Sequence, residues 1–191
     1  MSVLKKWDII KSDIVIENQW IKIRKDVCRL SNYMIIDDYF IIEKPDIVAI
    51  FPVNKEGKVV LVKQYKHGIQ KILLELPGGY IEKNETPLQA AIRELLEETG
   101  YSSNQITKIG TVINDSSNAS NIIHVFLAER VSKKHLQSLD LNEEILIELI
   151  DIHKLKEFII SGKITAQTSI ATTFLALNHL NLKINHANNV T

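Results

Sequence analysis

Short apolar patches alternate with polar residues along the first part of the chain, most clearly over residues 13–30. Residues 33–42 are rich in Tyr, Ile and Phe and surround Asp37 and Asp38 in a hairpin-like pattern. A period of two places alternate side chains on the two faces of a strand. The first 44 residues are therefore predicted to form β-strands.

Pro45 ends this region, and two apolar runs follow it. Residues 47–53 and 58–64 are joined by a polar turn that ends in Gly57, which predicts a second hairpin. Three further apolar runs are also predicted to be strands, over residues 106–113, 122–128 and 145–152.

Residues 86–89 indicate the start of a helix. Thr86 suits the N-cap, Pro87 suits the first turn, and Gln89 can complete a capping box by bonding back to the N-cap backbone. The predicted helix runs to Thr99 and ends at Gly100. Two more helices are predicted over residues 155–161 and 168–180. Strands around a central helix, without regular β–α–β alternation, favour a mixed sheet with helices packed on its faces.

Composition and charge narrow the class of protein. The chain has 191 residues, 45% hydrophobic and 24% charged, and its 23 basic and 23 acidic residues give zero net charge, which disfavours nucleic-acid or anionic-membrane partners. The lone Cys28 excludes an internal disulfide and a Cys-based zinc cluster, and its apolar surroundings indicate a buried thiol. Neither a secretory signal nor a membrane-spanning stretch is evident, so a cytoplasmic location is expected.

The central helix carries its charge at an unfavourable end. Glu94, Glu97 and Glu98 occupy its final turns, where the helix dipole is negative and cations are preferred by about 0.3–1 kcal/mol each. They are predicted to face away from an apolar stripe made of Leu88, Ala91, Ile92, Leu95 and Thr99. A divalent cation with hard oxygen ligands would offset this repulsion. The alternative is an ordinary solvated acidic face.

Taken together, the pattern Gly79-x5-Glu85-x7-Arg93-Glu94-Leu95-x-Glu97-Glu98-x-Gly100 resembles the signature box of the Nudix hydrolases. Tyr101 follows it, where the box usually has Ile, Leu or Val. Residues 64–66, 74–79, 122–128 and 161–164 are similar to the ADP-ribose pyrophosphatase branch of that family.

The resemblance implies a Nudix fold: an α/β/α sandwich around a mixed sheet in residues 45–191, preceded by a small antiparallel β-subdomain in residues 1–44. It implies Mg²⁺- or Mn²⁺-dependent cleavage of a nucleoside diphosphate linked to another group. The metal ligands it implies are Glu94, Glu98, Glu97 and the backbone carbonyl of Gly78. Glu85 and Arg93 would pair to hold the loop on the helix, and Gly79 and Gly100 complete the box.

The water-activating base has three candidates. Some Nudix enzymes use a box glutamate, here Glu97, whereas the ADP-ribose branch uses one from a later loop. Glu143 and Glu144 lie in the matching region and are favoured over Glu97. The alternative is that both are only a charged approach to the strand that follows.

Substrate contacts are also implied by the resemblance. Trp20 is similar to an N-terminal aromatic that stacks on adenine, in a homodimer where the β-subdomain of one subunit completes the site of the other. The alternative is that Trp20 is a core or interface residue. Glu75 matches a residue that joins the site near the metals, and Lys66 stands where Arg is usual for binding phosphate.

The leading hypothesis is a Mg²⁺-dependent pyrophosphatase that acts on ADP-ribose or another nucleoside diphosphate sugar as a homodimer. The second hypothesis keeps the same chemistry but takes the substrate to be a dinucleotide, a coenzyme or another nucleoside diphosphate derivative. The third is a non-catalytic domain that senses a nucleotide, which usually lacks box carboxylates; this chain retains them all.

Overall fold

The structure is a computed structural model that describes residues 4–188, with side chains as far as residue 181. Two compact units make up the chain. The first contains the residues up to Pro45 together with residues 113–122, a segment distant in sequence. The second contains residues 46–112 and the chain from Ile123 onward. Over the described residues, no helix is long and apolar enough to cross a membrane.

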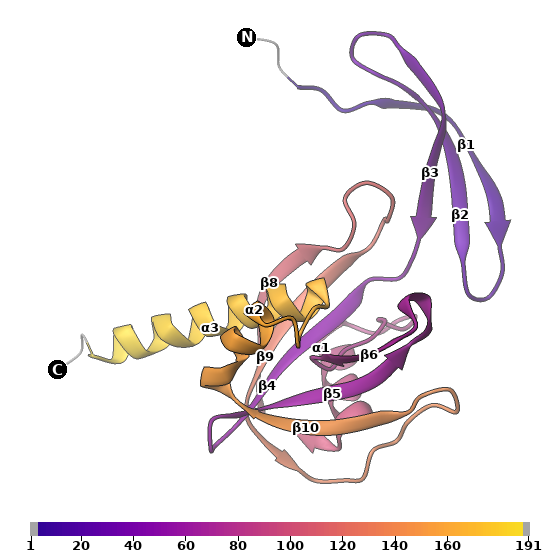
Figure 1. Ribbon diagram of the computed structural model, residues 1–191. Helices are drawn as coiled ribbons and strands as arrows, with labels where there is room; N and C mark the ends of the chain where they lie inside the picture. Colours follow the sequence, from indigo (N-terminus) through magenta and orange to yellow (C-terminus); the bar gives the residue numbers. More distant parts are fainter. Residues whose placement is uncertain (1–3, 189–191) are drawn as a thin grey trace. The chain divides into compact units, whose positions relative to one another are not determined.

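The first unit holds an antiparallel sheet of three strands, β1 (Asp8–Glu17), β2 (Lys22–Arg29) and β3 (Ile35–Glu43), in that order (Figure 1). The prediction of strands is confirmed, but the hairpin-like reading of residues 33–42 is wrong. β3 continues through Asp37 and Asp38, and the chain turns earlier, at Tyr33 with φ 68°. Cys28 on β2 is buried, as predicted.

The second unit is built on a seven-stranded sheet. Its path runs β10-β5-β4-β9-β7, with β6 beside β5 and β8 beside β9. β4 and β9 are parallel and the β4–β5, β5–β10, β5–β6 and β7–β9 pairs antiparallel, so the sheet is mixed as predicted. The strands are β4 (Ile47–Asn54), β5 (Lys58–Lys66), β6 (Lys71–Glu75), β7 (Tyr101–Ser102), β8 (Gln105–Ile113), β9 (Ile122–Lys133) and β10 (Ile145–Asp151).

Helices cover both faces of this sheet: α1 (Pro87–Thr99) lies behind it in Figure 1, and α2 (Leu155–Ile160) and α3 (Gln167–Asn188) lie in front. Alternate residues of β4 make the two interfaces. Val48 and Ile50 share a core with Leu95 of α1, whereas Phe51 and Val53 share one with α2 and α3. The α/β/α sandwich is therefore confirmed. Single-turn 3₁₀ helices follow β5 (His67–Ile69) and β10 (Ile152–Lys154).

The ends of α1 are those predicted. The Thr86 hydroxyl accepts a hydrogen bond from the Gln89 backbone N–H, and the Gln89 side chain accepts one from the N–H of Thr86. Gly100 ends the helix with φ 73° and donates to the carbonyl of Leu96 at 2.7 Å. A Cβ atom at this position would collide with the carbonyl oxygen of His135, so the close approach of that chain also requires glycine.

The predicted orientation of α1 is wrong in one respect. Leu88 and Ile92 of the expected stripe are 44% and 46% exposed, while Glu98 is buried. Glu98 follows Ala91 by seven residues and Leu95 by three, which places it on the same side of the helix as those two core residues. The buried face is therefore turned toward the carboxylates, so that one of them enters the protein.

Candidate active site

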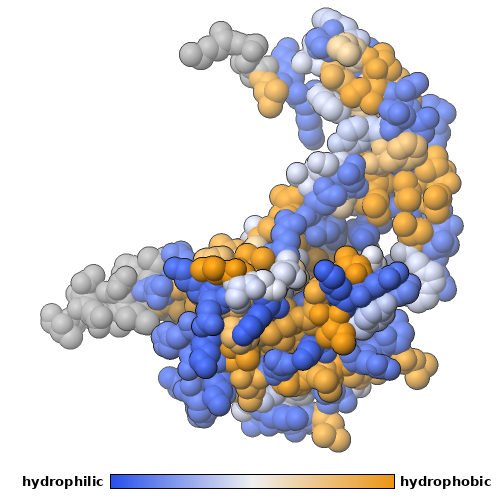
Figure 2. Space-filling view, viewed as in Figure 1, coloured by the Kyte–Doolittle hydropathy of each residue, from blue (hydrophilic) through white to orange (hydrophobic). Residues whose placement is uncertain are grey.

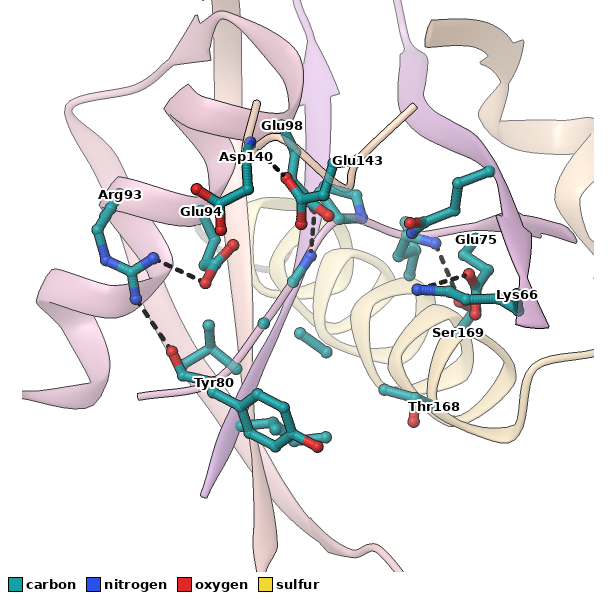
Figure 3. Close-up of a pocket in the computed structure, with 18 of the residues that line it drawn as sticks. Lys66, Glu75, Tyr80, Arg93, Glu94, Glu98, Asp140, Glu143, Thr168 and Ser169 are labelled. Carbon is teal, nitrogen blue, oxygen red and sulfur yellow. Dashed lines mark hydrogen bonds and ion pairs between the residues drawn. The ribbon is translucent and has the colours of Figure 1, made fainter. Parts of the chain in front are cut away.

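A cavity of about 470 Å³ opens in the second unit between α1, the sheet and the start of α3 (Figure 3). This volume lies in the ordinary range for small-molecule sites. Its acidic wall comes from Glu94 and Glu98 of α1, with Asp140 and Glu143 from the loop before β10. The remaining charged and polar lining residues are Gln64, Lys66, Glu75, Tyr80, Glu82, Arg93, Thr168 and Ser169.

The glycine-containing loop passes between β4 and α1. The N–H groups of Ile50 and Val48 donate to the carbonyls of Pro77 and Gly79, at 3.0 and 2.9 Å. In an extended segment the intervening residue directs its N–H and C=O to the opposite edge. Gly78 accordingly faces α1, and its N–H donates to Glu98 Oε2 at 2.8 Å.

Close packing requires glycine at position 78 and leaves no free space for a side chain at position 79. A Cβ atom on Gly78 would collide with the carbonyl oxygen of Val48, and one on Gly79 would collide with the carboxylate of Glu94. A side chain at either position would therefore push the loop away from β4 or displace Glu94.

Glu98 is the most deeply buried acid of the site, with 4% of its surface exposed. Burial raises the pKa of its carboxyl group to about 8, and the negative charges of Glu94 and Glu143 contribute, against the opposing effects of the Gly78 N–H and Lys66. Over residues 4–181, whose side chains the structure describes, no Lys, Arg or His side chain forms an ion pair with Glu98. A desolvated acid without a paired cation is suited to accept a cationic ligand.

Arg93 organises the other box acids. Its guanidinium donates to both oxygens of Glu85, each at 2.8 Å, to Glu94 at 2.8 Å and to Glu97 at 3.2 Å. A further bond reaches the Tyr80 carbonyl at 3.0 Å, so Arg93 ties the loop to the helix. Hydrogen bonding to Arg93 lowers the pKa of Glu85. Burial raises the pKa of Glu94, although Arg93 opposes this.

The three candidates for the base occupy different surroundings. Glu143 lines the cavity, whereas Glu97 and Glu144 do not. The side chain of Glu97 is 42% exposed and pairs with Arg93, and Glu144 is exposed and lines a neighbouring hollow that Glu143 also borders. Asp140, which sequence reasoning missed, lies with Glu143 at the acidic wall (Figure 3). A signal was present in the sequence, since an acid precedes Glu143 by three residues within one loop.

Lys66 and Glu75 lie at the other end of the cavity, away from Arg93 (Figure 3). Lys66 Nζ is 3.6 Å from Glu75 Oε2, an oxygen that is buried and accepts no hydrogen bond. Thr168 and Ser169, from the start of α3, complete this end and were also missed. The Ser169 hydroxyl accepts a bond from the Leu76 N–H at 2.9 Å, which fixes α3 against the loop.

Trp20 belongs to the first unit, in the turn between β1 and β2. Its side chain is 80% exposed, so it is not a core residue of this chain. The Asn18 side chain accepts hydrogen bonds from the N–H groups of Trp20 and Ile21, at 2.8 and 3.0 Å, and holds the turn that presents the indole.

The donor chemistry of the acidic wall fits a hard divalent cation. Carboxylate and carbonyl oxygens are the ligands that Mg²⁺ and Mn²⁺ prefer, and Glu94 and Glu98 bring two carboxylates to the cavity. Within the described part of the chain, no three acidic, His or Cys side chains are gathered closely enough to form a finished metal site. The fit therefore rests on the type of donor atom and on Glu98, a buried acid whose negative charge a bound cation would compensate.

The fold and the box of residues on α1 define the class of protein. A NUDIX domain model matches residues 43–168, and the chain belongs to the Nudix hydrolase family, which confirms the resemblance found in the sequence.

Two relatives and one solved structure refine the comparison. The ADP-ribose pyrophosphatase of Bacillus subtilis is 36% identical over 147 residues, 75% of this chain and 76% of that protein. The methanol dehydrogenase activator of Bacillus methanolicus is 32% identical over 143 residues, with the same two shares. A solved structure described as an ADP compounds hydrolase matches with a TM-score of 0.85 over 96% of this chain and 98% of that one, at 20% identity, and so shares the fold.

Proposed function

We propose that this protein hydrolyses the pyrophosphate bond of ADP-ribose or another nucleoside diphosphate sugar, giving a nucleoside monophosphate and a sugar phosphate. The observation that carries the proposal is the convergence of Glu94, Glu98 and Glu143 on one cavity. The Bacillus subtilis relative, an ADP-ribose pyrophosphatase, supports this class of substrate.

We assign the binding of Mg²⁺ or Mn²⁺ to Glu94, Glu98 and the Gly78 carbonyl, with Glu97 in a bridging or supporting role. When bound, the cation would neutralise phosphate oxygens and favour attack by water. Glu85 and Arg93 hold the loop against α1 and keep Glu94 in place. The ion pair between Arg93 and Glu94, at 2.8 Å, also limits how far that carboxylate can move.

Glu143 is the favoured base, because it lines the cavity beside the box acids and its charge acts on both Glu94 and Glu98. It would orient a water molecule and accept its proton. Lys66 would contact a phosphate as a point charge, and Glu75, whose buried Oε2 lies 3.6 Å from Lys66 Nζ, would line the substrate end of the cavity and hold Lys66 there.

A hydrolysis panel with and without Mg²⁺ tests the proposal. ADP-ribose and other nucleoside diphosphate sugars should yield a nucleoside monophosphate, and chelation should abolish turnover. Preference for a dinucleotide or coenzyme would establish the second hypothesis. Binding without turnover of any member of the panel would instead identify a nucleotide sensor and sink the hydrolase proposal.

We further propose that the protein is a cytoplasmic homodimer that associates through its first unit. Apolar side chains gather on the surface of that unit, visible in orange (Figure 2). Exposed members on β1 and β3 include Ile9, Ile14, Ile16, Ile35 and Phe40. An exposed apolar surface of this kind is typical of a protein interface, and sedimentation of the full chain measures the state directly.

We propose that Trp20 stacks on the base of the substrate. Residues 1–44 would then form a subdomain for dimerisation and base binding. Trp20→Ala should raise KM for adenine-containing substrates about five- to a hundredfold, with kcat little changed, because stacking contributes about 1–3 kcal/mol per base. Trp7→Ala is a control in the same unit, since Trp7 packs edge-on against Tyr39. An unchanged KM in Trp20→Ala would remove the indole from the substrate site.

A further inference from the structure

Backbone carbonyls at the C-terminal end of α1 accept hydrogen bonds from a segment that leads directly to Glu143. The last four carbonyls of a helix have no partners within it. In this protein the N–H of Ser138 donates to the Glu97 carbonyl at 2.9 Å, and the N–H groups of Lys134 and His135 donate to the Gly100 carbonyl at 2.9 and 3.2 Å. Residues 134–138 therefore fasten the end of the helix that carries the metal-binding acids.

Gln137 makes the contact that joins this fastening to the loop. Its Nε2 donates to the backbone carbonyl of Glu98 at 2.6 Å and to that of Ile145 at 3.1 Å. Glu98 is the buried acid of α1, and Ile145 begins β10 two residues after Glu143. One amide group thus links the two ends of the loop formed by residues 138–144 to each other and to α1.

Inside the closed loop, Glu143 is held by the backbone. Its carboxylate accepts a bond from the Asp140 N–H at 3.2 Å, and its own N–H donates to the Asp140 carbonyl at 3.0 Å. This reciprocal pair fixes the carboxylate within the loop but does not fix the loop against α1. The Ser138 N–H does so at the Glu97 carbonyl, and the side chain of Gln137 does so at the Glu98 carbonyl while also binding the far end of the loop at Ile145.

We propose that Gln137 is a positioning residue that sets the place of Glu143 relative to Glu98; its catalytic consequence rests on the proposed function. Both acceptors of the Gln137 amide are main-chain carbonyls, so these bonds leave the carboxylates of the cavity untouched. Its effect on turnover is therefore exerted through the position of the loop. A misplacement of about 1 Å can cost about a hundredfold in rate.

Gln137→Met removes both donors and keeps the length of the side chain. We expect kcat to fall about ten- to a hundredfold with KM within about twofold, because the loop and not the substrate site loses its tether. In a Glu143→Gln background the same change should lower kcat no further, since the group it positions is already absent. Hydrogen exchange should quicken in residues 138–144 while the core of α1 stays protected.

Gln105→Met makes the same chemical change at an exposed position at the start of β8 and should leave kcat unchanged. Should Gln137→Met fail to fold, Gln137→Asn, which keeps the amide but shortens its reach, carries the same expectation. Equal losses of kcat in both backgrounds would show a general structural role and overturn the proposal, as would unchanged exchange in the loop. If the wild type hydrolyses no nucleotide, the hydrolase assignment fails on its own, while hydrogen exchange still decides whether Gln137 tethers the loop.

Discussion

Glu98→Gln is expected to lower kcat by about a hundredfold to a thousandfold or more while the fold remains intact. Glutamine matches the shape of glutamate, and its side-chain oxygen can still accept the hydrogen bond from Gly78. The core contacts of Leu95 and Ala91 are not touched. What is removed is the negative charge that would hold the cation, so the loss falls on catalysis. Steady-state kinetics at several Mg²⁺ concentrations measure it.

The same variant should affect stability in a pH-dependent way. In the metal-free protein the pKa of Glu98 is raised to about 8, above the value of about 4.3 in an unfolded chain. The stabilisation due to this shift is fully present below pH 4.3 and is lost as the pH rises through 8. A neutral glutamine has no such loss, so Glu98→Gln should gain in melting temperature relative to the wild type between pH 5 and 9 in the presence of chelator.

Glu157→Gln serves as the control, because Glu157 lies on α2 and outside the cavity. It should keep the wild-type kcat. Near-normal activity of Glu98→Gln at low Mg²⁺ would exclude Glu98 from the metal site, and an unchanged difference in melting temperature across the pH range would contradict the raised pKa.

Features that depend on neighbours in sequence were predictable. The limits of α1 follow from the reciprocal cap of Thr86 and Gln89 and from the left-handed conformation of Gly100, which are local and independent of the rest of the fold. The turn at Gly57, with φ 73°, is equally local. The box residues themselves were identified by their resemblance to the Nudix signature, whose spacing lies within a single helix and its preceding loop.

Features that depend on tertiary packing were not predictable. The stripe of Leu88 and Ile92 is as apolar as the true core face, and the approach of Gly78, whose N–H binds the buried Glu98, is not visible in the sequence around the helix. β6 was missed because its five residues are too few for a period of two to stand out. The place of Asp140 depends on how a loop returns to α1, which no local pattern encodes.

Glu143→Gln is expected to lower kcat by about a hundredfold to ten-thousandfold, and Glu144→Gln to leave it near the wild-type value. The two residues are adjacent in sequence but differ in surroundings: Glu143 lines the cavity and is fixed by the Asp140 N–H, whereas Glu144 is exposed. Glutamine at position 143 can still accept that N–H, so the loop keeps its shape while the group that would take a proton from water is lost. The pair is therefore a matched comparison of one chemical change.

The comparison is made at saturating Mg²⁺, because Glu143 also acts electrostatically on Glu94 and Glu98, and its neutralisation alters their affinity for a cation. A loss of kcat that persists at saturation belongs to the chemical step. A larger loss of kcat in Glu144→Gln than in Glu143→Gln would assign the base to Glu144 and require a different conformation of the loop. Full kcat in both variants would end the loop assignment and leave Glu97, tested by Glu97→Gln in the same assay, as the remaining candidate.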